Sequence, residues 1–215
     1  MKIFLDTADV GAIRRANDTG LLDGVTTNPS KIVESGRGFF EVVREICSIV
    51  KGPVSAEAVA DTAEEIIARA EELAALAPNV VNKVPMTPEG LKAACILERD
   101  RGLRVNVTMV FSADQACLAM KTGATFVSLV LSRLDRIAGD STVLLEDTVR
   151  IKNNYGFTSG ILAASLKTRQ HVLACMKAGI DIVSIPEALF FELFEHPLTE
   201  QGLEAFERDW GKVRM

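Results

Sequence analysis

The 215-residue sequence has few residues of the kinds that most often build metal sites and disulfide frameworks. It contains only two histidines and four cysteines. A histidine-bound metal or a Ser-His-Asp triad therefore has little to draw on. The cysteines are far apart and lie in stretches of helical periodicity, which predicts buried free thiols rather than disulfides or a metal cluster. They are Cys47, Cys95, Cys117 and Cys175.

The sequence also lacks the common nucleotide motifs and any block of one charge. No GxGxxG, GxxxxGK[ST] or HExxH pattern is present, which argues against a dinucleotide site, a P-loop and a zincin centre. There are 24 basic and 29 acidic residues, a net charge of −5, and only one tyrosine and one tryptophan. Without a basic patch or stacking residues, we expect no nucleic-acid partner.

Long apolar runs are absent as well. No segment approaches the ~18–20 apolar residues needed to cross a bilayer. Asp6 and Asp9 occupy the N-terminal region, where a signal peptide would need an apolar stretch. We therefore expect a cytoplasmic protein with no membrane partner.

Short runs rich in β-branched residues recur along the chain, and segments with apolar spacing near 3.6 residues lie between them. The strands are predicted to begin near Ile3, Val25, Val54, Val80, Val105, Phe126, Ile161 and Ile182. These starts are roughly 25 residues apart, about the length of one compact βα unit. Eight such units favour an α/β fold, a closed parallel (β/α)8 barrel, in one domain spanning residues 1–215.

Capping signals mark several of the predicted helices. The clearest helical segments are Phe39 to Val50, Thr62 to Leu76 and Pro88 to Leu97. Thr87 before Pro88 supplies a capping hydroxyl and a proline for the first helical position. Three glycines follow helical stretches and precede strands, as residues with left-handed backbone conformation do. They are Gly102, Gly123 and Gly179.

The last predicted helix, about residues 198–213, is surplus to a minimal barrel. Its apolar residues Leu203, Phe206 and Trp210 need a partner surface, either on this barrel or on a neighbouring subunit.

Polar residues close almost every predicted strand, at the end of the barrel where (β/α)8 active sites lie. They are Asp6, Thr26, Thr27, Asn28, Glu57, Lys83, Asn106, Thr108, Ser128, Ser165 and Lys167. The set combines one lysine with two carboxylates and several neutral hydrogen-bonding groups, followed by a second lysine on strand seven.

Lys83 interrupts the apolar strand VVNKVP and is the strongest single signal. Burial disfavours the charged form of a lysine, and a neutral amine can form an imine with a ketone. An imine is the electron sink needed to break or make the neighbouring carbon–carbon bond. The alternative is a buried ion pair of Lys83 with Asp6 or Glu57.

The carboxylates suggest proton transfer. Asp6 follows KIFL at a strand tip, where it could exchange protons with a substrate hydroxyl. The alternative is that Asp6 caps a helix that begins near Asp9. Glu57 and Thr108 could hold a water that moves protons during imine formation and hydrolysis.

Arg133, Ser165 and Lys167 combine two cations with a hydroxyl near the late strands, where many barrels bind phosphate. The alternative is that Arg133 pairs with Asp135 or Asp140 and that Lys167 is a solvated residue at a helix start.

Taken together, these residues resemble the small transaldolase family, which includes fructose-6-phosphate aldolase. The similarity extends over essentially the whole chain, through the motifs MKIFLDTAD, DGVTTNPS, KGPVSAE, KVPMTPEG, NVTMVFS, GATFVS, NNYGF, AAS, HPLT and the terminal DW. It implies a (β/α)8 TIM barrel with an extra C-terminal helix. It also implies a Schiff-base mechanism, because Lys83 matches the lysine of the family motif K-[VI]-P-M-T.

The same resemblance assigns roles to the other residues. Asp6 matches the acid/base aspartate, and Glu57 and Thr108 match the pair that positions a catalytic water. The residues expected to bind substrate are Thr26, Asn28, Asn106, Ser128, Arg133, Ser165 and Lys167. Within that set the last three match the phosphate site.

The family reaction transfers a dihydroxyacetone unit from a ketose phosphate, fructose 6-phosphate or sedoheptulose 7-phosphate, to an aldose phosphate acceptor. The resemblance implies sugar-phosphate partners and no metal or organic cofactor. It also implies a homo-oligomer, a pentamer or decamer, assembled through the C-terminal helix.

The sequence departs from the family pattern in three places. Glu57 favours a transaldolase, whereas AASLKT, with Lys167 where transaldolases usually have arginine, is more similar to the aldolase branch. On strand six the family pattern S-P-F-[VL]-G-R appears as SLVLSR. Asn82 stands where the family prefers an aliphatic residue, and it would need a buried partner.

Three hypotheses follow for the function. The first is a transaldolase. The second is an aldolase, or a transaldolase acting on a variant anionic ketose such as a sulfonated one. The third is a non-catalytic barrel that binds sugar phosphates.

Overall fold

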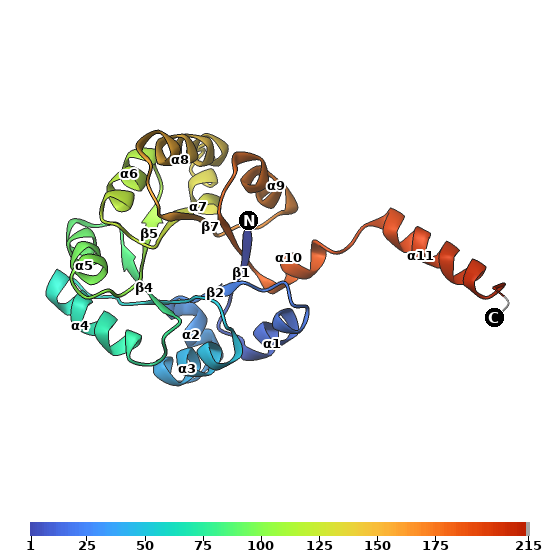
Figure 1. The fold of residues 1–215 in the computed structure, drawn as a ribbon, viewed down its shortest axis with the longest axis horizontal. Coiled ribbons are helices and arrows are strands. Elements are labelled where there is room, and N and C mark those ends of the chain that lie inside the picture. The colour runs from blue at the N-terminus through green and yellow to red at the C-terminus, as the bar shows by residue number, and fades with distance from the viewer. Residues whose placement is uncertain (214–215) are drawn as a thin grey trace.

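A computed structural model describes residues 1–213 and shows a closed barrel of parallel strands surrounded by helices (Figure 1). The strands pair in sequence order, and β8 returns to β1 to close the barrel. They are β1 Lys2–Asp6, β2 Gly24–Thr26, β3 Val54–Glu57, β4 Val80–Pro85, β5 Val105–Val110, β6 Phe126–Val130, β7 Gly160–Ala164 and β8 Ile182–Ile185. The fold is therefore a (β/α)8 TIM barrel, as predicted.

Helices follow the strands, and all but the last, α11, surround the barrel (Figure 1). They are α1 Val10–Asp18, α2 Pro29–Ser35, α3 Phe39–Ile49, α4 Ala63–Ala74, α5 Pro88–Arg99, α6 Ala113–Lys121, α7 Leu131–Asp135, α8 Ser141–Tyr155, α9 Arg169–Ala178, α10 Glu187–Glu192 and α11 Pro197–Trp210. Extra helices follow β2, β6 and β8, and the first two of these lie next to the polar end of the barrel.

The sequence signals for boundaries agree closely with the structure. Every strand begins within one residue of its predicted start. Thr87 caps α5 by accepting the Gly90 N–H at 3.0 Å. Gly102, Gly123 and Gly179 have φ angles of +63°, +89° and +82°, a conformation that side chains other than glycine rarely adopt.

The floor of the barrel is filled by aromatic and aliphatic side chains. Phe4 and Phe126 pack edge to face with ring centroids 6.0 Å apart, beside Val81, Leu162 and Ile182. A Cβ on Gly24 would lie 2.7 Å from the Phe4 ring, so this strand needs glycine there. These buried side chains fill the interior of the barrel.

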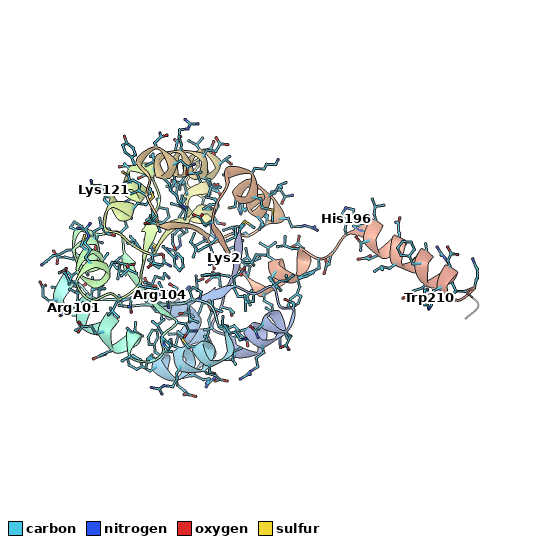
Figure 2. All side chains as sticks on the ribbon, in the orientation of Figure 1. Lys2, Arg101, Arg104, Lys121, His196 and Trp210 are labelled. Carbon is cyan, nitrogen blue, oxygen red and sulfur yellow. The ribbon has the colours of Figure 1, made fainter. Side chains whose placement is uncertain are left out.

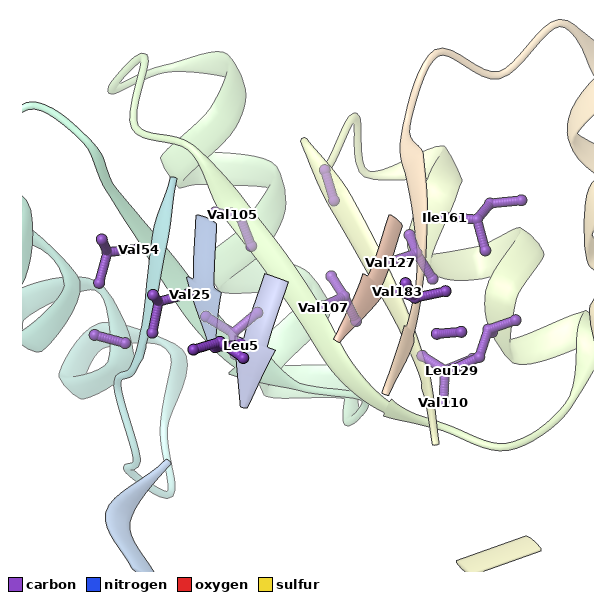
Figure 3. Packing of buried hydrophobic residues seen from close by; sticks show 14 of the residues in the cluster. Leu5, Val25, Val54, Val105, Val107, Val110, Val127, Leu129, Ile161 and Val183 are labelled. Atoms are coloured by element: carbon purple, nitrogen blue, oxygen red, sulfur yellow. The ribbon is translucent and has the colours of Figure 1, made fainter. Parts of the chain in front are cut away.

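A second, larger core lies between the strands and the helices. Val, Leu and Ile residues on the outer face of the strands pack there, among them Val25, Val54, Val107 and Ile161 (Figure 3). Strands buried on both faces are rich in such residues, which is why the sequence shows apolar runs rather than strict alternation.

One outward-facing strand residue, Asn82 on β4, is polar. It is fully buried, and neither atom of its side-chain amide has a hydrogen-bond partner within residues 1–213. From the sequence we expect Asn82 to need a buried hydrogen-bond partner, and the described residues do not provide one. An unpaired buried amide costs about 1–3 kcal/mol.

Replacing Asn82 with valine is therefore expected to stabilise the fold. The free energy of unfolding should rise by about 1–3 kcal/mol, because the variant removes the unpaired amide and places a β-branched residue on a strand. Urea denaturation of both proteins measures the difference. A loss of stability would show that the amide has a partner that the variant cannot replace.

The C-terminal helix α11 projects away from the barrel (Figure 1). It begins after His196, which caps it, and within the helix no residue is buried. Phe206 and Trp210 are 72% and 68% exposed, and Figure 2 shows Trp210 near the far end of the projecting helix. The helix therefore does not use its own barrel as the partner surface.

The cysteines do not form disulfides. The four cysteines are free; Cys175 is buried, whereas the other three are only partly buried, contrary to the prediction for them. Burial raises the pKa of the Cys175 thiol to about 12 and that of Cys47 to about 11, so both stay protonated.

In the described part of the chain no helix is both long and apolar enough to cross a membrane.

Candidate active site

A cavity of about 450 Å³ opens at the carboxyl ends of the strands and collects most of the polar residues singled out in the sequence. Its lining includes Asp6, Thr26, Asn28, Glu57, Lys83, Asn106, Thr108, Ser128, Arg133 and Ser165. Strand register explains part of this grouping. Glu57, Lys83 and Asn106 are paired across β3, β4 and β5, so they lie at one level of the barrel.

Lys83 is held by two oxygen atoms. Its Nζ donates to Glu57 Oε2 at 3.0 Å and to the Thr27 carbonyl at 3.2 Å. The side chains of Lys83 and Glu57 are 13% and 16% exposed, so this ion pair is largely removed from water. The partner of Lys83 is thus Glu57 rather than Asp6, and the carboxylate is placed to accept a proton from the lysine.

Asp6 lies at the end of β1 in the same cavity. Burial raises the pKa of its carboxyl above the ordinary value, and the positive charges of Lys83, Lys31 and Lys167 and a hydrogen bond from Thr26 partly oppose this. The alternative role as a helix cap is wrong. Asp9 caps α1, accepting the Gly11 N–H at 2.8 Å and the Ala12 N–H at 3.2 Å.

Neutral side chains that line the cavity form two separate sets of hydrogen bonds with buried neighbours. Ser128 Oγ donates to Asn106 Oδ1 at 2.7 Å, and Asn106 Nδ2 donates to Ser55 Oγ at 3.0 Å. Thr26 and Ser184 share a hydrogen bond of 2.6 Å between their hydroxyls. These bonds fix the side chains in place before any substrate arrives.

Asn28 stands at the junction of β2 and α2. Its Oδ1 accepts the Lys31 N–H at 3.1 Å, which caps α2, while its side chain also lines the cavity. Pro29 follows at the first helical position. The order Asn-Pro thus starts a helix at the cavity wall.

Arg133 and Ser165 line the opposite part of the cavity wall, whereas Lys167 is exposed and is not among the lining residues. In the described chain neither Asp135 nor Asp140 forms an ion pair with Arg133. The Arg133 guanidinium instead contacts Met109 Sδ at 3.6 Å.

Backbone strain is concentrated at this wall. A β-bulge in β5 inserts one extra residue, because Val107 pairs with Val127 of β6 whereas Val110, three residues on, pairs with Leu129, only two residues on. Within it Met109 has a φ of +64°, and Ser165 after β7 has a φ of +61°. Non-glycine residues adopt this conformation at a cost and are frequent at functional sites.

The lining residues that the sequence did not single out include Lys31 and Met109. Lys31 pairs with Glu34 at 3.2 Å and also lines a neighbouring cavity of about 550 Å³ beside α1. The signal for Lys31 was its position three residues after Asn28, in the first turn of a helix at the barrel mouth. No local sequence pattern predicts the β-bulge that places Met109 at the cavity.

Among residues 1–213, histidine, cysteine, aspartate and glutamate side chains do not form a group of three that could ligate an ion.

Comparisons with known proteins point to one family. The model of the family "Transaldolase/Fructose-6-phosphate aldolase" matches residues 3–214. A probable transaldolase of Geobacter metallireducens is 51% identical over 213 residues, covering 99% of both chains. One of Moorella thermoacetica is 50% identical over 214 residues, covering 100% of this chain and 99% of its own.

Solved structures of other enzymes share the fold. A putative phosphonomutase from Burkholderia cenocepacia aligns with a TM-score of 0.62 at 12% identity, over 96% of this chain and 92% of its own. Inosine 5′-monophosphate dehydrogenase from Legionella pneumophila aligns with a TM-score of 0.63 at 16% identity, over 88% of this chain and 58% of its own. At such identities the likeness concerns the barrel alone. The match of the family model and the close relatives, by contrast, place this chain in the transaldolase/fructose-6-phosphate aldolase family.

Proposed function

We propose that this protein is a transaldolase that forms a Schiff base through Lys83. The observation that carries the proposal is the Lys83–Glu57 pair, 3.0 Å apart inside the barrel cavity, with Asp6 in the same cavity. A substrate ketone can reach a lysine there that has a proton acceptor beside it. Membership of the family and the names of the close relatives support the same activity.

Imine formation begins with a proton transfer. Glu57 takes a proton from the Lys83 ammonium, and the free amine attacks the C2 carbonyl of the ketose. The resulting carbinolamine loses its hydroxyl as water, after protonation, and leaves an iminium. Thr108, which lines the cavity, would orient this water together with Glu57.

Cleavage uses the second carboxylate. Asp6 removes the proton of the C4 hydroxyl, the C3–C4 bond breaks, and its electron pair moves into the iminium to give an enamine. The aldose leaves, and the enamine carbon attacks the aldehyde of an acceptor. Asp6 returns its proton to the new hydroxyl, and hydrolysis of the imine then releases the product ketose.

The remaining lining residues would recognise the sugar. Thr26, Asn28, Asn106 and Ser128 would bind the hydroxyls, and Arg133 and Ser165 the anionic end. Lys167, which is exposed and does not line the cavity, would approach that end from outside. Because the iminium itself accepts the electrons of the broken bond, the reaction draws on no group beyond these side chains.

The test is the dependence of fructose 6-phosphate turnover on an acceptor. With erythrose 4-phosphate present, we expect sedoheptulose 7-phosphate and glyceraldehyde 3-phosphate. Without it, release of glyceraldehyde 3-phosphate should fall at least about tenfold, because the enamine has no aldehyde to attack. Equal rates with and without the acceptor would instead identify an aldolase.

A second candidate is an aldolase, or a transaldolase for a variant anionic ketose. The observation in its favour is Val130, which lines the cavity and is 6% exposed, at the position where the family pattern has an aromatic residue. A smaller side chain leaves a wider cavity, which shifts the choice of substrate. If fructose 6-phosphate gives no turnover, ketoses that carry a sulfonate in place of the phosphate should be assayed next.

The projecting helix supports a third element of the proposal, a homo-oligomer. Helix α11 carries Leu198, Leu203, Phe206 and Trp210, all more than half exposed. An amphipathic helix with an uncovered apolar face needs a partner. A second copy of this chain offers one, because its barrel surface is not covered by its own projecting helix.

Placing serine at both Phe206 and Trp210 is therefore expected to dissociate the oligomer. The mass measured by light scattering should fall to that of one chain, 23.3 kDa. Tyr155→Ser is the matched control, since Tyr155 on α8 is an aromatic residue with the same 72% exposure as Phe206. Retention of the wild-type mass by the double variant would contradict the proposal.

A further inference from the structure

The anion-binding wall is made of two separate chain segments. Arg133 lies on the short helix α7 after β6, and Ser165 and Lys167 lie on the turn between β7 and α9. Arg133 is exposed, and Ser165 has a strained backbone. The strand ladder ends at Val130 and Ala164, so it does not by itself fix how these two segments face each other.

Two contacts connect the segments, one on each side of Arg133 in the sequence. Ser132, the preceding residue, donates its hydroxyl to the Ser165 carbonyl. Asp135, two residues after Arg133, lies with Oδ2 3.4 Å from His171 Nε2 on α9. This carboxylate oxygen is buried, and within residues 1–213 no hydrogen bond reaches it, so the His171 imidazole is a polar group that lies close to it.

His171 extends the second contact to the turn itself. Its Nδ1 accepts the backbone N–H of Lys167 at 3.2 Å, and the backbone N–H of His171 donates to Thr168 Oγ1 at 3.2 Å. Because Nδ1 accepts a hydrogen bond, the neutral ring carries its proton on Nε2, facing Asp135. Asp135, His171 and Lys167 therefore form one chain of contacts from α7 to the turn.

We propose that Asp135 and His171 are positioning residues for the anion subsite. Together they hold Arg133 and the turn that contains Ser165 and Lys167 at the spacing that surrounds the anionic end of the substrate. This inference rests on the proposed function for the identity of the substrate. The binding of an oxyanion, however, can be measured without turnover.

The test compares His171→Phe, which keeps a ring but removes both nitrogens, with His196→Phe. His196 makes a closely similar contact, with Nδ1 accepting the Leu198 N–H at 3.2 Å, but it lies at the start of α11, away from the cavity. The probe is inorganic phosphate, titrated calorimetrically at constant ionic strength. We expect His171→Phe to raise the Kd for phosphate about tenfold and His196→Phe to leave it unchanged.

Asp135→Asn and the double variant complete a cycle. If the two side chains act as one unit, the double variant should bind phosphate no more weakly than either single variant. This comparison measures the coupling between Asp135 and His171, so the inference does not depend on the His171→Phe variant alone. Thermal unfolding of each variant confirms that binding is measured on folded protein.

Kinetics separate positioning from a general loss of structure. With fructose 6-phosphate, His171→Phe should raise KM about tenfold while kcat changes less than threefold. Equal phosphate affinity in the wild type and His171→Phe, or no measurable phosphate binding by the wild type, would overturn the inference. Phosphate binding that weakens as expected, in a protein without transaldolase turnover, would instead overturn only the proposed function.

Discussion

Replacing Lys83 with alanine is expected to lower kcat/KM for fructose 6-phosphate by a factor on the order of 10⁴ or more. The variant removes the only nucleophile proposed to form the imine. Lys83 also neutralises Glu57, which is 16% exposed, and its loss leaves that carboxylate without its ion pair. We therefore expect a further loss of about 1–3 kcal/mol in the free energy of unfolding.

The matched control for this prediction is Lys92→Ala. Lys92 also pairs with a glutamate, Glu64, at 2.9 Å, but on the helical surface, with 51% of its side chain exposed. Its removal should change neither turnover nor stability appreciably. Steady-state assays on all three proteins, at a temperature where each is folded, measure the effect. Activity of Lys83→Ala within tenfold of the wild type would refute imine formation at this residue.

The second large effect is expected for Asp6→Asn, and here activity and stability should change in opposite directions. Turnover should fall by about 10²–10⁴-fold, because the amide cannot exchange a proton with the C4 hydroxyl. Stability at pH 7 should rise. Burial raises the pKa of Asp6 above its unfolded value near ~3.9, so the ionised carboxylate disfavours the folded state at neutral pH.

The sign of this stability effect can be checked by its pH dependence. Below the unfolded pKa, Asp6 is protonated in both states, and the wild type and the variant should be equally stable. The advantage of the variant should grow as pH rises through the folded pKa. Urea denaturation from pH 3 to pH 8 measures it, with the exposed Asp18→Asn as the control. A variant less stable than the wild type at pH 7 would show that Asp6 is held by favourable contacts instead.

Much of the barrel could be predicted from the sequence because its signals are local. Strands buried on both faces leave apolar runs, and the cap of Thr87 and the glycine at Gly179 mark where the chain leaves a helix. The closing polar residues could be grouped because parallel strands end at one face. Lys83 was recognisable for the same reason, as a charged residue interrupting a buried strand.

What the sequence could not supply are the features that depend on long-range geometry. It left open whether Lys83 pairs with Asp6 or Glu57, and only the register of β3 against β4 decides for Glu57. The bulge that exposes Met109 to the cavity arises from the mismatch of β5 and β6. Lys31 was missed because its relation to the cavity depends on how α2 folds back at the mouth of the barrel.

The altered segment of strand six illustrates the same division. The sequence shows that Ser132 replaces a glycine of the family pattern. Without the structure, this substitution indicates only a larger side chain. In the structure its hydroxyl donates to the Ser165 carbonyl and connects the two segments of the anion-binding wall. Val130 faces the cavity, whereas Leu129 is buried in the outer core, so the two neighbouring changes differ in consequence.

The most direct test of the central claim is to trap the imine. The protein is mixed with fructose 6-phosphate and reduced with borohydride, and the intact mass and the modified residue are determined for the wild type and Lys83→Ala. If the central claim holds, we expect a reduced three-carbon adduct on Lys83 of the wild type and none on the variant. An adduct on another lysine, or none under conditions that label a known transaldolase, would contradict it.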